Sequence, residues 1–261
     1  MTYKAALVTG AGARLGRAMA LKLAEKGVSV AVHYAASEKG AAETADMVRE
    51  KGVSAAVVQA DLLDRDAILR LVPRAVDALE QPLDVLINNA SIFEYDNIET
   101  ASFESWDRHM ATNLKAPLFL TQAFAAQAPD PSLDEGGEPV ARASVVNMID
   151  QRVRKLTPEF MTYTLAKSAL WTLTQTSAQA LAPKVRVNGI GPGPTVQGHR
   201  QSETHFAKQR SATILKRGSS PFEIAQALDF ILGTAGLTGQ ILCLDGGQHL
   251  SWQTPDVLGL E

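Results

Sequence analysis

The chain alternates short apolar segments with helix-like segments almost from one end to the other. In the first helix-like segment, Leu15, Met19 and Leu23 recur at the four-residue spacing of one helix face. Continuous apolar strands separated by helices form a parallel sheet that is covered on both faces. The sequence therefore predicts an α/β fold, a single doubly wound, Rossmann-like domain over residues 1–261 with a seven-stranded parallel sheet. The predicted strands are 4–10, 28–34, 53–61, 83–90, 142–150, 184–193 and 239–247, and the main helices after the first are 38–52, 64–79, about 103–127, about 160–181 and 221–232.

Two segments interrupt this alternation. Residues 129–139, PDPSLDEGGEP, are polar and rich in proline and glycine, so we expect a surface loop. Residues 194–220 follow the sixth predicted strand. Ligands of doubly wound sheets bind at the carboxyl ends of the strands, so a long connection there predicts a substrate lid.

Pro73 predicts an irregularity in the helix 64–79.

Composition narrows the class of protein. Apolar residues make up 46% of the 261 positions and charged residues 20%, as in soluble globular proteins. A net charge of −3 gives no reason to expect nucleic acid or an anionic membrane as a partner. Cys243 is the single cysteine and lies in an apolar strand, which predicts core packing. The five histidines show no metal-ligand spacing, so no metal is predicted. The chain enters its first strand at once and has no apolar run that could span a bilayer, which favours a cytoplasmic protein.

Gly10, Gly12 and Gly16 occupy the predicted turn between the first strand and the first helix. Glycines in this position let the backbone approach a phosphate, and a helix N-terminus offers free N–H groups. The turn therefore predicts a dinucleotide site. Arg14 stands where the middle glycine is expected.

The end of the second strand bears on the choice between NAD and NADP. Sites that prefer NAD place a carboxylate here for the ribose hydroxyls. This chain has no acid from His33 to Ser37, and the hydroxyl of Ser37 and the cation of Arg14 favour a 2′-phosphate, so NADP (NADPH) is the predicted cofactor. Asp61 ends the third strand and either accepts a hydrogen bond from adenine or caps the next helix.

Tyr163 and Lys167 stand four residues apart in YTLAK, on one face of the helix after the fifth strand. A nearby ammonium stabilises a phenolate, so Lys167 is expected to lower the pKa of Tyr163. Such a tyrosine can give a proton to a substrate heteroatom while a nicotinamide delivers hydride.

With TGAGARLG, NNAS, Asn113, YTLAK, PGP and LDGG in order, the chain resembles the short-chain dehydrogenases/reductases over nearly its full length. The resemblance implies that Tyr163 is the catalytic acid, that Lys167 binds the nicotinamide ribose, and that Asn113 holds a water of the proton relay. Homotetramers are usual in that family. The cofactor contacts it implies, taken with the residues above, are Gly10, Gly12, Arg14, Leu15, Gly16, His33, Tyr34, Ser37, Asp61, Leu62, Asn89, Ala90, Lys167, Pro192, Gly193 and Thr195.

Departures from the common family pattern point to a subgroup. Arg14 replaces a glycine, Ser91 replaces the glycine of NNAG, and Asp150 replaces the catalytic serine. With Phe93, these residues resemble the pteridine reductases. That likeness implies that Arg14 touches cofactor phosphate and pterin, that Ser91 bonds the pterin, that Phe93 stacks on it, and that Asp150 works with the tyrosine. Pteridine reductases commonly have an arginine where this chain has Ala36, so its preference for NADPH over NADH is expected to be modest unless His33 or Lys39 contributes.

The chemistry of Asp150 favours the same substrate class. An ionised carboxylate repels a developing oxyanion, whereas a carboxyl that shares a proton with Tyr163 can relay it to a ring nitrogen. We therefore expect reduction of a C=N bond in a pterin or dihydropteridine. The alternatives are a ketone or aldehyde reductase of the same fold, and a nucleotide-binding regulator without turnover. His199, Arg200 and His205, in the predicted lid, are expected to be solvated.

Overall fold

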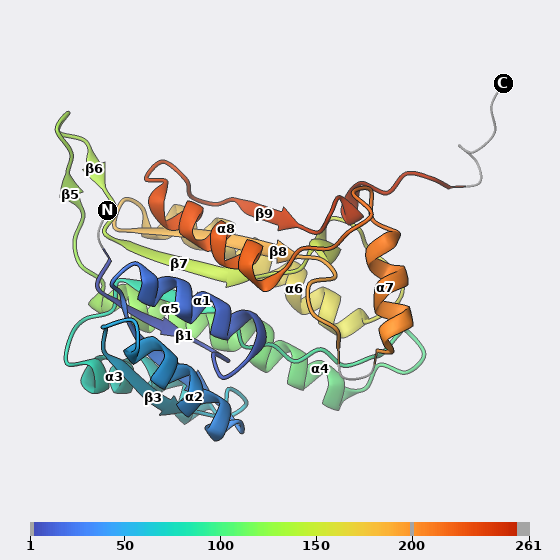
Figure 1. Cartoon of the computed structure of the whole chain (residues 1–261), viewed down its shortest axis with the longest axis horizontal. Helices are drawn as coiled ribbons and strands as arrows, with labels where there is room; N and C mark the ends of the chain where they lie inside the picture. Colours follow the sequence, from blue (N-terminus) through green and yellow to red (C-terminus); the bar gives the residue numbers. More distant parts are fainter. Residues whose placement is uncertain (1–2, 199–200, 255–261) are drawn as a thin grey trace.

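The computed structural model of the chain describes residues 3–198 and 201–254. It contains a seven-stranded, all-parallel sheet in the order β3-β2-β1-β4-β7-β8-β9, which confirms the predicted fold (Figure 1). The sheet strands are β1 (Ala5–Val8), β2 (Ser29–Tyr34), β3 (Ala55–Gln59), β4 (Val85–Asn88), β7 (Ala143–Met148), β8 (Val185–Pro192) and β9 (Ile241–Leu244). The helices are α1 (Arg14–Glu25), α2 (Glu38–Arg49), α3 (Arg65–Leu79), α4 (Phe103–Met110), α5 (Ala116–Gln127), α6 (Met161–Leu181), α7 (Glu203–Ser211) and α8 (Pro221–Gly233).

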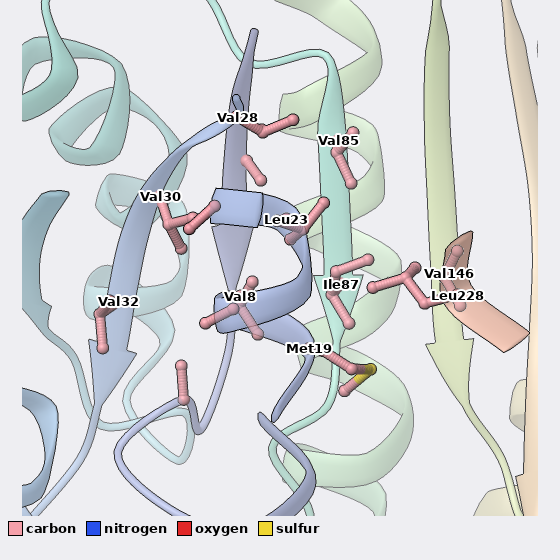
Figure 2. Close-up of a cluster of buried hydrophobic side chains, with 14 of the residues drawn as sticks. Val8, Met19, Leu23, Val28, Val30, Val32, Val85, Ile87, Val146 and Leu228 are labelled. Atoms are coloured by element: carbon pink, nitrogen blue, oxygen red, sulfur yellow. The ribbon is translucent and has the colours of Figure 1, made fainter. Parts of the chain in front are cut away.

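The helices cover the sheet in two layers, each with its own apolar core. On one face, α1, α2 and α8 pack on the strands, and Met19 and Leu23 of α1 lie over Val8 and Ile87 (Figure 2). On the other face, α3, α5 and α6 bury a second cluster that includes Phe124. Burying one large apolar side chain is worth about 1.5–3 kcal/mol, so these two layers fix the positions of the strand ends.

The strand order reverses between β1 and β4. From β1 the chain adds β2 and β3 on one side, and β4 then begins on the other side of β1. The loops that follow β1 and β4 run in opposite directions away from this switch point. Open α/β sheets bind their ligands in the crevice between such loops. Gly10 follows β1 here, and Asn89 follows β4.

Three predictions about secondary structure need correction. Residues 129–139 are exposed but contain a short antiparallel hairpin, β5 (Ser132–Leu133) with β6 (Pro139–Val140). This hairpin lies at the amino ends of the strands, at the opposite end of the molecule from α7 (Figure 1). Pro73 lies inside α3 without ending it. The long helix predicted over about 103–127 is instead α4 and α5, joined by a π-helical turn at Ala111–Lys115.

Cys243 lies in β9 but is only half-buried.

In the part of the chain that the structure describes, none of the helices is both long enough and apolar enough to cross a bilayer.

Candidate active site

The turn after β1 is closely packed and fixed by hydrogen bonds. Gly10 has a φ of +62°, and a Cβ on Gly16 would lie 2.4 Å from the Gly10 carbonyl oxygen, so a side chain at Gly16 is excluded. The amide of Asn89 donates to the carbonyls of Thr9 at 2.7 Å and Gly10 at 3.1 Å. Asn89 therefore ties the turn to the end of β4.

The N-terminus of α1 fits a phosphate. No side chain caps it, because the residue before the helix is Ala13, and the first turn contains no acidic residue. An uncapped helix N-terminus leaves N–H groups and a positive dipole end for an anion. Gly12 and Leu15 belong to the same turn and helix start, so these elements can hold the phosphates of a dinucleotide.

Arg14 begins α1 and has a φ of 53°, a conformation that favours glycine. This explains why glycine is usual at its position. The exposed guanidinium donates to the carbonyl of Val196 at 3.1 Å. Arg14 therefore links the phosphate turn to the first residues of the predicted lid.

The expectation that the His33 side chain contacts cofactor needs correction. The ring is only 1% exposed. Its Nδ1 accepts a hydrogen bond from the N–H of Gly10 at 3.0 Å, and Nε2 lies 3.0 Å from the carbonyl oxygen of Ala60. Burial lowers the pKa of His33 to about 4, so the ring is neutral. Its hydrogen bond with Gly10 stabilises the turn after β1.

The remaining residues expected at the adenosine end lie at the carboxyl ends of β2 and β3. Tyr34 is half-buried, and Ser37 is exposed at the start of α2. Asp61 is exposed and accepts a hydrogen bond from the N–H of Leu63 at 2.9 Å, while Leu62 is buried. The helix cap foreseen as one role for Asp61 is instead made by Asp64, which accepts from the N–H groups of two residues at the start of α3.

Tyr163 and Asp150 are joined directly. The Tyr163 hydroxyl donates to Asp150 Oδ2 at 2.9 Å, and Asp150 Oδ1 accepts from the N–H of Arg152 at 2.8 Å. Loss of contact with water raises the pKa of Asp150. Burial and the Asp150 carboxylate raise the pKa of Tyr163 well above its ordinary value. The expected lowering of this pKa is therefore wrong, and Tyr163 is a neutral phenol that holds its proton.

Lys167 does not bond the tyrosine hydroxyl. Its ammonium donates to the carbonyl of Met148 at 2.7 Å and lies 5.6 Å from the centre of the Tyr163 ring. Burial lowers the pKa of Lys167 to about 8, while Asp150 opposes that shift. The cation is thus held beneath the tyrosine ring, at the edge where β7 ends.

Aromatic rings form one wall of the site. Phe93 stacks on Phe160 with the ring centres 4.3 Å apart, and it meets the Tyr163 ring edge-on at 4.7 Å. Phe93 remains 51% exposed, so part of the ring is free to pack against a ligand. Ser91, also exposed, lies two residues earlier, and its hydroxyl is close enough to lower the pKa of Tyr163.

Asn113 lies in the π-helical turn and is fully buried. Its side-chain oxygen accepts from the N–H of Ile92 at 2.9 Å, and its nitrogen donates to the Ile92 carbonyl at 2.8 Å. Both groups of the Asn113 side-chain amide therefore hold the segment that contains Ser91 and Phe93, and its expected role in holding a water of the proton relay stays a prediction. Single-turn π-helices are frequent at functional sites.

The segment 194–220 is fastened at both ends. Arg210 donates to the carbonyls of Pro194 at 2.7 Å and Ser219 at 2.9 Å, and the hydroxyls of Thr195 and Ser219 are 2.7 Å apart. Pro192 and Gly193 precede it at the end of β8, where a Cβ on Gly193 would lie 2.6 Å from Asp245. The middle of the segment, α7, buries no side chain.

His205 is exposed on α7, as expected. His199 and Arg200 lie outside the described residues.

The sequence analysis missed a buried polar cluster behind Tyr163, made by Asp96, His109 and Thr162. His109 Nδ1 lies 2.7 Å from the hydroxyl oxygen of Thr162, which donates in turn to Asp96. The one signal for it is that His109 precedes Asn113 by four residues, on the same predicted helix face.

Comparison with known proteins identifies the family. The family model described as short chain dehydrogenase matches residues 4–208. The chain therefore belongs to the short-chain dehydrogenase family of oxidoreductases.

Three similar proteins have names that state different reductase activities. The FolM alternative dihydrofolate reductase 1 of Brucella suis, solved in complex with NADP, is 41% identical with a TM-score of 0.89, covering 97% of this chain and 98% of that one. The angucycline C-6 ketoreductase LanV with bound NADP is 29% identical with a TM-score of 0.85, covering 95% and 96%. The 3-oxoacyl-[acyl-carrier-protein] reductase FabG of Staphylococcus aureus is 30% identical, covering 95% and 98%.

Proposed function

We propose that this protein is an NADPH-dependent reductase of a pterin or dihydropteridine. The observation that supports this most is the hydrogen bond from Tyr163 to Asp150, where the common family pattern has a serine hydroxyl. The likeness to a dihydrofolate reductase crystallised with NADP agrees with the proposal.

The dinucleotide would be held by the turn after β1, the N-terminus of α1, Asn89 and Ala90 after β4, and the residues that follow β8. Lys167 would lie at the ribose of the nicotinamide, and Ser37 beside the 2′-phosphate. When bound, the reduced nicotinamide supplies a hydride. The network from His33 through Gly10 to Asn89 keeps these contact groups in place before the cofactor arrives.

The chain's own residues manage the proton. Tyr163 is a neutral phenol and can donate its proton to the ring nitrogen of a C=N bond as the carbon accepts hydride. Asp150 accepts from that phenol and has a raised pKa, so it can exchange the proton with solvent and return it to Tyr163. The same carboxylate, when ionised, repels the oxyanion that forms when a ketone is reduced.

The flat face of the substrate would pack against Phe93, with Ser91 and Arg14 setting its orientation. Phe93 is half-exposed and held edge-on to Tyr163, which places an aromatic surface beside the proton donor. A heteroaromatic ring matches such a surface better than a small aliphatic ketone does.

A second candidate is an NADPH-dependent ketone or aldehyde reductase, which the identity to LanV and FabG favours. The test is turnover with NADPH of dihydrobiopterin, dihydromonapterin and dihydrofolate beside a panel of ketones. Reduction of a dihydropterin with the higher kcat/KM supports the proposal. Reduction of ketones alone would establish the second candidate.

A further inference from the structure

Phe93 is fixed in place by two side chains of the same helical stretch. Asn113 bonds both backbone groups of Ile92, directly before Phe93. His109, one turn earlier, accepts a hydrogen bond from the N–H of Glu94 at Nε2, directly after Phe93, at 3.2 Å. The backbone on both sides of the exposed aromatic ring is therefore held by buried side chains.

His109 also reaches the residue beside the proton donor. Its Nδ1 lies 2.7 Å from the hydroxyl oxygen of Thr162, and Thr162 directly precedes Tyr163. The three members of the cluster, Asp96, His109 and Thr162, are at most 3% exposed. The mechanism above uses none of them, and an imidazole buried so deeply must have partners for both nitrogens.

The hydrogen bonds define the tautomer of His109. The Thr162 hydroxyl donates its proton to a carboxylate oxygen of Asp96, so towards His109 it can only accept. Nδ1 of His109 therefore carries a proton, and Nε2 is left to accept the Glu94 N–H. This series of hydrogen bonds runs from Asp96 through Thr162 and His109 to the N–H of Glu94. Every donor in it has an acceptor only when the His109 ring is neutral.

Asp96 extends this chain to the start of α6. Its carboxylate accepts from the N–H of Thr162 at 3.1 Å, and its backbone carbonyl accepts from the N–H of Phe160 at 2.7 Å. Phe160 is the residue on which Phe93 stacks. The cluster thus connects both rings of the aromatic wall with the helix that contains Tyr163.

We propose that His109 is a positioning residue for substrate binding, which holds Phe93 at its edge-on contact with Tyr163 through the Glu94 N–H and the Thr162 hydroxyl. This inference rests on the proposal that substrate packs against Phe93, but it does not depend on whether that substrate is a pterin or a ketone.

A double-mutant cycle between His109 and Phe93 tests it, read with whichever substrate the wild type reduces. Losing a buried hydrogen bond that holds a binding surface should raise the substrate KM of His109→Leu about tenfold and leave the KM for NADPH within about twofold. In a Phe93→Ala background the same change should add less than about threefold, because the ring that His109 positions is already missing.

Three further variants sharpen the cycle. His109→Gln offers an acceptor for the Glu94 N–H and should recover most of the lost affinity. Arg108→Met breaks the partly exposed ion pair to the Glu94 side chain but leaves the Glu94 N–H bond intact, so it should have little effect. Thr162→Val removes the hydroxyl link at similar volume and replaces His109→Leu if that variant does not fold.

Multiplicative effects of His109→Leu and Phe93→Ala, or an unchanged substrate KM in either single variant, would overturn the proposal. The ¹⁵N spectrum of the histidines in the free protein tests the tautomer without any substrate. A neutral His109 protonated at Nδ1 is expected, and a ring protonated at Nε2 would contradict the hydrogen-bond chain.

Discussion

The hydroxyl of Tyr163 and the carboxylate of Asp150 lie 2.9 Å apart, with the hydroxyl as donor, thirteen residues apart in the sequence. They meet because β7 ends just before Asp150, and α6 returns along the sheet to place Tyr163 over that strand end. Both groups have a raised pKa. Burial and the Asp150 carboxylate raise the pKa of Tyr163, whereas burial raises the pKa of Asp150 and the hydrogen bond from Tyr163 opposes that rise. We therefore expect the two residues to act together in transferring the proton.

Replacing Tyr163 with phenylalanine removes the proposed proton donor and keeps the ring. General acid catalysis is typically worth about 10²–10⁴-fold, so we expect kcat of Tyr163→Phe to fall by that order. Binding of NADPH, followed by its fluorescence, should change little. Near-full turnover on the same substrate would show that another group, such as Asp150, donates the proton.

The carboxyl end of β2 should select NADPH over NADH. No acid stands between His33 and Ser37, and Ser37 is exposed there, so we expect kcat/KM with NADPH to exceed that with NADH by about tenfold, or roughly 1.4 kcal/mol. Ser37→Asp should shift the ratio toward NADH by repelling the 2′-phosphate. Equal or better efficiency of the wild type with NADH would contradict this assignment.

The buried His33 should make the fold acid-sensitive. Its pKa is about 4 in the folded protein and near 6.5 in the unfolded chain. Between these values the unfolded chain binds more protons, so stability is full above pH 6.5 and falls as the pH drops toward 4. The group accounts for roughly 3 kcal/mol of that loss.

Urea denaturation of wild type and His33→Gln at pH 7 and pH 4.5 isolates this contribution, because glutamine does not titrate. The difference in unfolding free energy between the two pH values should be smaller for the variant. Equal differences would mean that His33 does not titrate as described.

Self-association is a further prediction. Large apolar side chains are exposed on two separate helices. They are Phe103 and Trp106 on α4, and Phe222 and Phe230 on α8. Two separate apolar faces, with the resemblance to a family in which homotetramers are usual, suggest that copies of this chain pair through both faces. Sedimentation velocity at micromolar concentration should show a tetramer, and Phe222→Ser should reduce it to a dimer. A monomer in the wild type would contradict the prediction.

The fold could be predicted from the sequence because strands and helices have different hydrophobic periods, and the strand ends then bring the motifs together. Gly10, Tyr163 and Asp150 are examples, since each directly follows a strand or lies on the helix after one. The residues that escaped prediction act through hydrogen bonds between distant segments. The sequence predicts a cofactor contact for His33 because periodicity does not show which groups pack on the end of a strand. In the structure the ring is buried and accepts a hydrogen bond from the N–H of Gly10.

The pKa of Tyr163 shows a different limit. Four-residue spacing on a helix placed Lys167 near the ring, but only the three-dimensional structure shows that the ammonium bonds Met148 and that Asp150 takes the tyrosine hydroxyl. The π-helical turn at Asn113 could not be predicted either, because apolar periodicity does not distinguish one π-helical turn from the α-helices on either side of it. The partner of the Asn113 amide, Ile92, lies in a different loop.

The most direct test of the proposed function compares wild type with Asp150→Ser on dihydrobiopterin and on a panel of activated ketones, with NADPH. The change removes the carboxylate that shares the Tyr163 proton and restores the neutral hydroxyl donor that suits a ketone oxygen. We predict that pterin reduction falls while ketone reduction is maintained or rises. A wild type that ignores every pterin and reduces ketones, with a serine variant that merely does so faster, would contradict the pteridine reductase assignment.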